Sequence, residues 1–355
     1  MSEESVLYAR KTKVEPLCPI FNSCGGCRFQ DASYERELAI KEAYLKRVLR
    51  RVASFDTSVL DAIVPSPAAY HYRSRLDIGF YRTKRGEYLM GFMPEGGRNI
   101  IPMESCAIAR KEISDFLPEL FEQAVAKLPQ HYKTANLVVK TGDDGRVFWG
   151  GIGRRSLELQ EKDYFWTEIM GKKIFYSLDT FFQANLSILP LLLERIEAIA
   201  NFDRDTHFID LYAGVGLFGL SFSDKVAKST LIEHCINSIK MTKYNAAHRN
   251  GGRTDIRHGR VEDELPDVIG TTEYGRKIAM IDPPRRGLSP EVCEFLSGMK
   301  EVNTLFYLSC NPKALARDLS VFLDRGWTIE RIVPFDFFPK TRHLETLVKL
   351  IQGKP

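Results

Sequence analysis

The segment 208–220 reads Phe-Ile-Asp-Leu-Tyr-Ala-Gly-Val-Gly-Leu-Phe-Gly-Leu, an apolar strand that runs into a G-x-G-x-x-G turn. Glycines at 214, 216 and 219 allow the backbone to approach a nucleotide-like ligand and the next helix to pack closely. Taken alone, the pattern also occurs in NAD enzymes and by chance. With the apolar run before it, it predicts an open α/β sheet whose ligand crevice begins at this turn.

Three more apolar runs, at 229–233, 277–281 and 304–308, are predicted strands of the same sheet. Charged or reactive side chains stand at or near the strand ends: Asp210, Glu233, Asp282 and Cys310. Ligands of open α/β sheets bind beyond the carboxyl ends of the strands, so we expect these side chains to meet in one crevice. Each acid taken alone is also compatible with a helix cap or a solvated turn.

Cys310 lies where the strand 304–308 is expected to turn into a helix over 313–319, with Pro312 in its first turn. Unpaired amides at a helix N-terminus favour negative charge, so we expect this thiol to lean toward the nucleophilic thiolate. The alternative is that Cys310 is a small apolar residue that fills the end of a strand.

Four other cysteines form a second candidate site. Cys18, Cys24 and Cys27 give the spacing C-x5-C-x2-C, and Cys106 supplies a distant fourth thiol. Four thiolates suit either zinc or an iron–sulfur cluster, and the spacing does not decide between them. Disulfides are disfavoured because the chain opens without a signal-peptide pattern and is predicted to be cytoplasmic. Cys235 and Cys293 lie in helical patterns and are expected to serve packing.

Composition describes a folded protein of about two domains. The chain has 355 residues, 44% hydrophobic and 27% charged, and no apolar run long enough to span a membrane. The net charge of +4 permits binding to nucleic acid without requiring it.

The N-terminal half combines hairpins with one amphipathic helix. Residues 70–82 alternate basic and aromatic side chains before a turn at 83–87, and a second hairpin is expected over 137–149. Such side chains can contact phosphates and stack on bases, or can form a half-buried hairpin with a solvated face. Residues 31–52 show helical periodicity, and their charged residues are expected to face solvent.

Five motifs resemble those of the RNA 5-methyluridine methyltransferases, which use S-adenosylmethionine. They lie at 181–185, 210–216, 282–287, 309–312 and 339–345, in the family's order. The resemblance implies a Rossmann-like class I methyltransferase domain and an enzyme that methylates C5 of uracil in RNA. It assigns cofactor contacts to Gln183, Tyr212, Glu233 and Asp282, the nucleophile to Cys310 and the general base to Glu345. Ala213 stands where many members have Cys, and Leu217 where some have Asn, so Leu217 is left out of the site.

This chemistry accounts for the residue types. C5 of uracil is a poor nucleophile, but addition of a thiolate at C6 gives an enolate whose C5 can attack a methyl group on sulfonium. A base must then remove the C5 proton before the thiol can leave. Because folded RNA hides C5 and C6 in the stack, flipping of the base into the crevice is expected.

The resemblance also implies an arrangement and partners. Cys18, Cys24, Cys27 and Cys106 would hold a [4Fe–4S] cluster in a β-rich central domain inserted into the methyltransferase fold. The expected units are 1–30 with the cluster loop, a helix at 31–61 packing on the methyltransferase domain, a central domain at 62–180, and the methyltransferase domain at 181–355. Only 17 residues precede Cys18, too few for the N-terminal oligonucleotide-binding barrel of many members. The expected partner is RNA, with 23S ribosomal RNA favoured over tRNA, and the expected state is a monomer.

Four other functions compete with this interpretation. An adenine amino-methyltransferase needs no thiol and carries a different motif from the one at Asp282. A cytosine-C5 enzyme would be expected to place its cysteine in other motifs, and the setting of Glu345 favours uridine. An RNA-binding scaffold with idle catalytic residues would show no turnover with labelled cofactor, whereas an NAD oxidoreductase leaves Cys310 and Glu345 unexplained.

Overall fold

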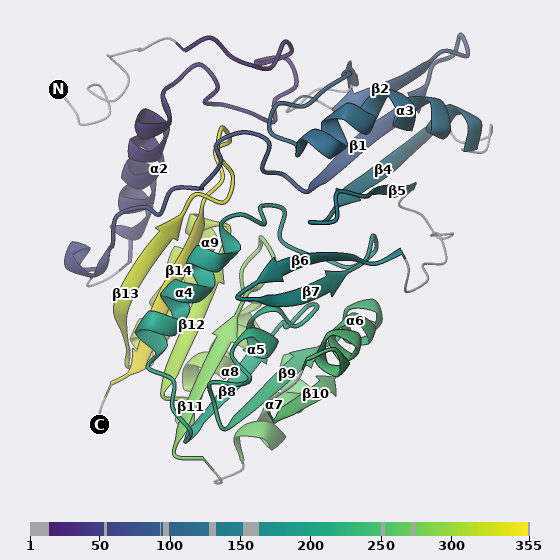
Figure 1. Ribbon diagram of the computed structural model, residues 1–355. Coiled ribbons are helices and arrows are strands. Elements are labelled where there is room, and N and C mark those ends of the chain that lie inside the picture. Colours follow the sequence, from purple (N-terminus) through teal and green to yellow (C-terminus); the bar gives the residue numbers. More distant parts are fainter. Residues whose placement is uncertain are drawn as a thin grey trace, which may run out of the picture.

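A computed structural model describes residues 14–52, 55–92, 94, 99–127, 133–151, 163–249, 253–270 and 274–353. The first residues of the chain, in which the sequence showed no signal pattern, lie outside these ranges. Figure 1 shows a small sheet with its helix at the upper right and a larger sheet flanked by helices below it. Among the helices that the structure describes, none has the length and apolar character needed to cross a bilayer.

The larger sheet positions the predicted crevice, and its seven strands lie in the order β10-β9-β8-β11-β12-β14-β13. The strands are β8 Thr206–Leu211, β9 Lys228–Glu233, β10 Thr254–His258, β11 Arg276–Ile281, β12 Thr304–Ser309, β13 Trp327–Phe335 and β14 Glu345–Gln352. The strands predicted from apolar runs are therefore confirmed. β8 to β12 are parallel, whereas β14 is antiparallel to both β12 and β13. The first residue of β14 thus lies at the edge where the parallel strands end.

Helices cover both faces of this sheet. They are α2 Tyr34–Leu49, α4 Leu189–Ala200, α5 Leu217–Ser221, α6 Ile236–Ala247, α7 Val261–Ile269, α8 Pro290–Gly298 and α9 Pro312–Asp324. Successive residues of a strand enter different core clusters, as Met280 and Ile281 of β11 do. Burial on both faces explains why these strands are continuous apolar runs. The hairpin of β6 Phe165–Ile169 and β7 Lys172–Tyr176 packs into the cluster that contains α4 and α5.

The smaller sheet has five strands in the order β3-β2-β1-β4-β5 and is packed by helix α3 Lys111–Lys127. Its strands are β1 Arg75–Arg82, β2 Tyr88–Phe92, β3 Ile101–Pro102, β4 Thr134–Thr141 and β5 Val147–Gly151. Both predicted hairpins are confirmed. β1 begins later than the predicted position 70, because His71 has a positive φ of 54° and Arg73 donates its backbone N–H to Ile108 O instead.

Helix α2 packs on the larger sheet through Leu45, Val48 and Leu49, after which a short 3-10 helix spans Thr57–Val59. The prediction that its charged residues face solvent is wrong for Glu37 and Lys41, which are 0% and 2% exposed. Lys41 Nζ donates to Glu37 Oε1 and to Asp336 Oδ1, both at 2.7 Å. Lys340 N–H also donates to Glu37 Oε1 at 2.6 Å. The helix thereby fixes the loop between β13 and β14, drawn in yellow in Figure 1.

Candidate active site

The ladder between β12 and β14 brings the predicted nucleophile and base together. Ser309 pairs with Thr346, so Cys310 and Glu345 follow on neighbouring strands at the same edge of the sheet. Glu345 is only 5% exposed, and Cys310 is half-buried. Burial raises the pKa of Glu345 well above its usual range; the nearby Asp282 adds to this increase, and Arg285 opposes it.

The thiol of Cys310 does not lean toward thiolate in the protein alone, contrary to our expectation. Burial raises its pKa to about 12, and the negative charges of Glu345 and Asp282 contribute further. Arg285 acts in the opposite direction. The helix N-terminus offers little help, because the side chain of Asn311 caps α9 by accepting from Lys313 N–H at 3.1 Å.

Asp282 and Gln183 meet across the crevice, although they are far apart in the sequence. Gln183 Nε2 donates to Asp282 Oδ2 at 3.1 Å. Burial raises the pKa of Asp282 to about 7, while the hydrogen bond from Gln183 lowers it. The loop after Asp282 is held by Asp318, which accepts from Leu288 N–H at 2.9 Å and from Tyr307 Oη at 2.6 Å.

The glycine turn and the acidic end of β9 form the other half of the crevice. Glu233 accepts from Gly214 N–H at 2.9 Å and from Cys235 N–H at 2.6 Å. Asp210 lies beneath this surface, 1% exposed, and its carboxylate accepts from Gly219 N–H at 2.7 Å. Asp210 therefore supports the turn and does not line the crevice. Tyr212 follows β8 in a left-handed conformation with a φ of 63°.

The four N-terminal cysteines lie apart from this centre and line one cavity of about 310 Å³. Gly26 N–H donates to Cys24 Sγ at 3.4 Å, and the side chain of Gln30 accepts from Cys18 N–H at 3.0 Å. Within the described part of the chain, no three Cys, His, Asp or Glu side chains are arranged to hold a metal ion. Four thiols around one cavity are chemically suited to either zinc or an iron–sulfur cluster.

The remaining cysteines differ from one another. Cys293 is buried in α8, as predicted for a packing residue. The same prediction is wrong for Cys235, which is exposed at the N-cap of α6.

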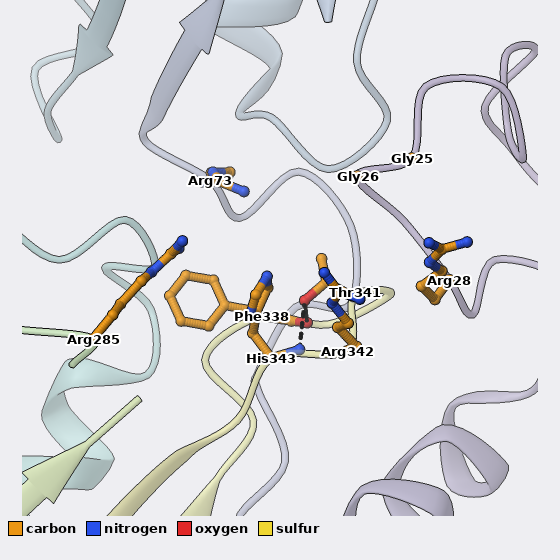
Figure 2. A pocket seen from close by; sticks show the side chains of 9 residues that line it. All are labelled: Gly25, Gly26, Arg28, Arg73, Arg285, Phe338, Thr341, Arg342 and His343. Carbon is orange, nitrogen blue, oxygen red and sulfur yellow. Dashed lines mark hydrogen bonds between the residues drawn. The ribbon is translucent and has the colours of Figure 1, made fainter. Parts of the chain in front are cut away.

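A second cavity, of about 140 Å³, adjoins the reactive centre and was missed by the sequence analysis. We call it the arginine pocket; Figure 2 shows its lining residues, Gly25, Gly26, Arg28, Arg73, Arg285, Phe338, Thr341, Arg342 and His343. Arg285 and Arg342 lie inside recognised motifs and could have been noticed there. Arg73 lies in the basic and aromatic stretch 70–82, whereas Arg28 carries no such signal, and only the fold brings the two together here.

The fold and site together define an α/β methyltransferase of Rossmann-like architecture. More specifically, the chain belongs to the tRNA (uracil-5-)-methyltransferase family, whose model matches residues 153–353. The fold is similar to that of the Pyrococcus abyssi tRNA (uracil-54, C5)-methyltransferase in complex with S-adenosyl-L-homocysteine, with a TM-score of 0.70, 21% identity and coverage of 96% of this chain and 88% of that one.

Curated relatives match nearly the whole chain, and two of them illustrate the range of their descriptions. The tRNA (uracil(54)-C(5))-methyltransferase of Schizosaccharomyces pombe is 28% identical over 94% of this chain, which spans 65% of that protein's length. A Thermotoga maritima protein described as an uncharacterized RNA methyltransferase is 27% identical over 98% of this chain and 87% of its own.

Proposed function

We propose that the protein transfers a methyl group from S-adenosylmethionine to C5 of a specific uridine in RNA. The observation that carries the proposal is the pairing of β12 with β14, which brings Cys310 and Glu345 to one edge of the sheet. Asp282 lies close enough to both residues that its charge raises the pKa of each. A thiol and a carboxyl at one reacting centre suit covalent addition followed by proton removal.

In the proposed reaction, Cys310 loses its proton to water, and its Sγ bonds to C6 of the flipped uracil. The electron pair of the C5–C6 bond moves toward O4, and C5 then takes the methyl group. That methyl group comes from S-adenosylmethionine, where it is an electrophile on sulfonium; its bond to sulfur breaks with the electron pair left on sulfur, and S-adenosylhomocysteine is released. The carboxylate of Glu345 next accepts the C5 proton, the C5–C6 double bond reforms, and the bond from Sγ to C6 breaks with its electrons returning to sulfur. Glu345 releases its proton to water and the cycle closes.

Gln183, Tyr212, Glu233 and Asp282 are proposed to hold the cofactor. Glu233 already uses its oxygens to accept from Gly214 and Cys235 amides, which orients the carboxylate for ribose hydroxyls. Gly219 lets helix α5 pack closely on β9, since a Cβ there would lie 2.5 Å from the Leu231 side chain. The hydrogen bond from Gln183 Nε2 fixes the carboxyl of Asp282.

We further propose that Cys18, Cys24, Cys27 and Cys106 hold a [4Fe–4S] cluster. Two points support this proposal. The four cysteines line one cavity, and a cluster there would join two segments that are far apart in the sequence. The division into units at 1–30, 31–61, 62–180 and 181–355 is part of the same proposal. In this division hairpin β6–β7 belongs to the third unit, and it packs with α4 and α5 of the fourth.

The RNA target has two candidates. The resemblance of the chain to cluster-bearing members of the family favours 23S ribosomal RNA. The tRNA activity named for the S. pombe relative, which matches 94% of this chain, favours position 54 of tRNA. Mass-spectrometric mapping of 5-methyluridine in RNA from cells with and without the gene tests both. Loss of 5-methyluridine at one position, restored by the wild type and not by Cys310→Ala, is expected. Unchanged 5-methyluridine in both RNAs would contradict the proposal.

A further inference from the structure

We propose that the arginine pocket binds a phosphodiester group of the RNA strand beside the target uridine. We also propose that the loop that carries Cys18, Cys24 and Cys27, here called the cysteine loop, forms one of the pocket's walls. The inference rests on the proposed function, because it names a part of the same substrate. It concerns a separate cavity, however, and assigns it a ligand of defined chemistry.

The donors of the pocket come from four separate segments. Arg28 follows the cysteine loop, Arg73 precedes β1, Arg285 follows β11, and Arg342 precedes β14. None of the nine lining residues is acidic. The whole chain carries a net charge of only +4, so this gathering of guanidinium groups is a local feature. The planar fork of a guanidinium matches the oxygens of a phosphate.

The pKa of His343 reflects the same cluster of positive charges. Its pKa is lowered to about 4, first by burial and then by the positive charges of Arg285, Arg342, Arg73 and Lys41. The imidazole is therefore neutral at physiological pH and adds no charge of its own. The cavity volume of about 140 Å³ is roughly ten times what one water molecule requires, which leaves room for a phosphate group.

The pocket has a fixed shape. Thr341 Oγ1 donates to Phe338 O at 2.8 Å and accepts from His343 N–H at 3.2 Å, the contact drawn in Figure 2. The guanidinium of Arg73 lies 6.0 Å from the centre of the Phe338 ring, and the rings of Phe338 and His343 are 6.0 Å apart. A turn held in this way places Arg342 at the cavity before any ligand binds.

The position of the pocket favours RNA over the cofactor as the source of the anion. Arg285 is close enough to Cys310 and Glu345 to lower the pKa of both. Arg342 and His343 lie just before β14, whereas the proposed ribose contact Glu233 ends β9, which three strands separate from β14 in the sheet order. An anion in the pocket is thus on the thiol side of the crevice, where the uridine must enter.

The cysteine loop is hydrogen-bonded to the segment that forms part of the arginine pocket. Arg28 N–H and Phe29 N–H both donate to Lys340 O, at 2.7 and 3.1 Å. Gly25, Gly26, Arg73 and Arg342 line both the arginine pocket and the cysteine cavity. A disturbance of the cysteine loop should therefore weaken RNA binding.

The test is equilibrium binding of the full-length protein to a fluorescent twelve-nucleotide oligouridylate between 50 and 200 mM KCl. Arg342→Gln and Arg28→Gln are compared with Arg325→Gln, which removes the same charge beyond the far end of α9. We expect each pocket variant to weaken binding about tenfold at low salt. The slope of log Kd against log salt should fall by about 0.7 per lost contact. With the neutral methylphosphonate oligomer, the difference from wild type should disappear.

Three results would overturn the inference. Pocket variants that bind like Arg325→Gln would show that no phosphate is held there. A deficit that persists with the methylphosphonate oligomer would point to contacts other than phosphate, and melting temperatures would reveal any misfolding. Weaker binding of S-adenosylhomocysteine with unchanged RNA binding would assign the pocket to the cofactor's carboxylate. Methyl transfer by the wild type is measured separately, so that failure of the proposed function remains distinguishable from failure of the pocket.

Discussion

Glu345→Gln should make the protein more stable at alkaline pH while it removes turnover. Oε2 of Glu345 is buried without a hydrogen-bond partner among the described residues, and burial raises the pKa of this carboxyl well above its usual range. The folded state therefore favours the protonated form. As the pH rises above about 4.3, the usual pKa of Glu, and on through the raised folded pKa, wild type loses stability that the glutamine variant keeps.

The size of this effect follows from the pKa difference. Each unit by which the folded pKa exceeds the unfolded pKa corresponds to about 1.4 kcal/mol. For a chain of 355 residues this is about 2 °C in Tm. The gain in Tm should be absent near pH 4 and should grow toward pH 8. Scanning calorimetry measures it, with Glu330→Gln as the control, because Glu330 is an exposed carboxylate of β13 that pairs with Lys349.

Turnover distinguishes a base from a structural carboxylate. Glutamine cannot accept the C5 proton, so addition and methylation proceed but the thiol is not expelled. Turnover should fall by roughly 10²–10⁴-fold, and a methylated covalent adduct of protein and RNA should accumulate. A denaturing gel with labelled methyl donor detects that adduct. Normal turnover, no trapped band and a lower Tm would show that Glu345 only pairs with a cation, and would refute the assignment.

Three further outcomes follow from the structure. Because the reactive forms of Cys310 and Glu345 are both deprotonated and both pKa values are raised, kcat/KM should increase from pH 6 to 9. Arg285→Gln removes a charge that lowers the pKa of Cys310, so it should shift that profile to higher pH; an unshifted or flat profile would argue against this electrostatic coupling. Wild-type protein purified without oxygen should be brown and absorb near 400 nm. The Cys106→Ser protein should contain less iron, and its smaller sheet should be less stable. One zinc and no iron by metal analysis of the wild type would exclude the cluster. Lys41→Met removes the cation that pairs with the buried carboxylate of Asp336 and should cost about 3–5 kcal/mol in chemical denaturation. A cost below about 1 kcal/mol would show that the network is dispensable.

The strands of the larger sheet could be predicted from the sequence because they are buried on both faces and so appear as continuous apolar runs. Because parallel strands end at the same edge of a sheet, the polar residues at their ends could also be assigned to that edge. The meeting of Cys310 with Glu345 needed more than this. It depends on β14 being antiparallel and on the register of Ser309 with Thr346, and neither is visible in a local pattern.

Contacts between distant segments explain the other failures. Lys41 can be buried because it forms an ion pair with Asp336, which lies 295 residues away in the sequence. Helical periodicity alone predicted that Lys41 faces solvent. The expected thiolate at Cys310 was wrong because burial and neighbouring carboxyls outweigh a helix terminus whose amides Asn311 already caps. The arginine pocket could not be predicted, since its residues come from segments that only the fold assembles.

The central claim is covalent catalysis by Cys310 at C6 of a uridine in RNA. Wild type is incubated with unlabelled cofactor and a target RNA in which uridine is replaced by 5-fluorouridine, whose fluorine cannot leave as a proton. Mass spectrometry of the digested complex should find a methylated fluorouridine bound to the peptide that contains Cys310, and Cys310→Ala should give no such complex. Absence of any denaturant-stable complex from wild type, or attachment at a different residue, would contradict the account.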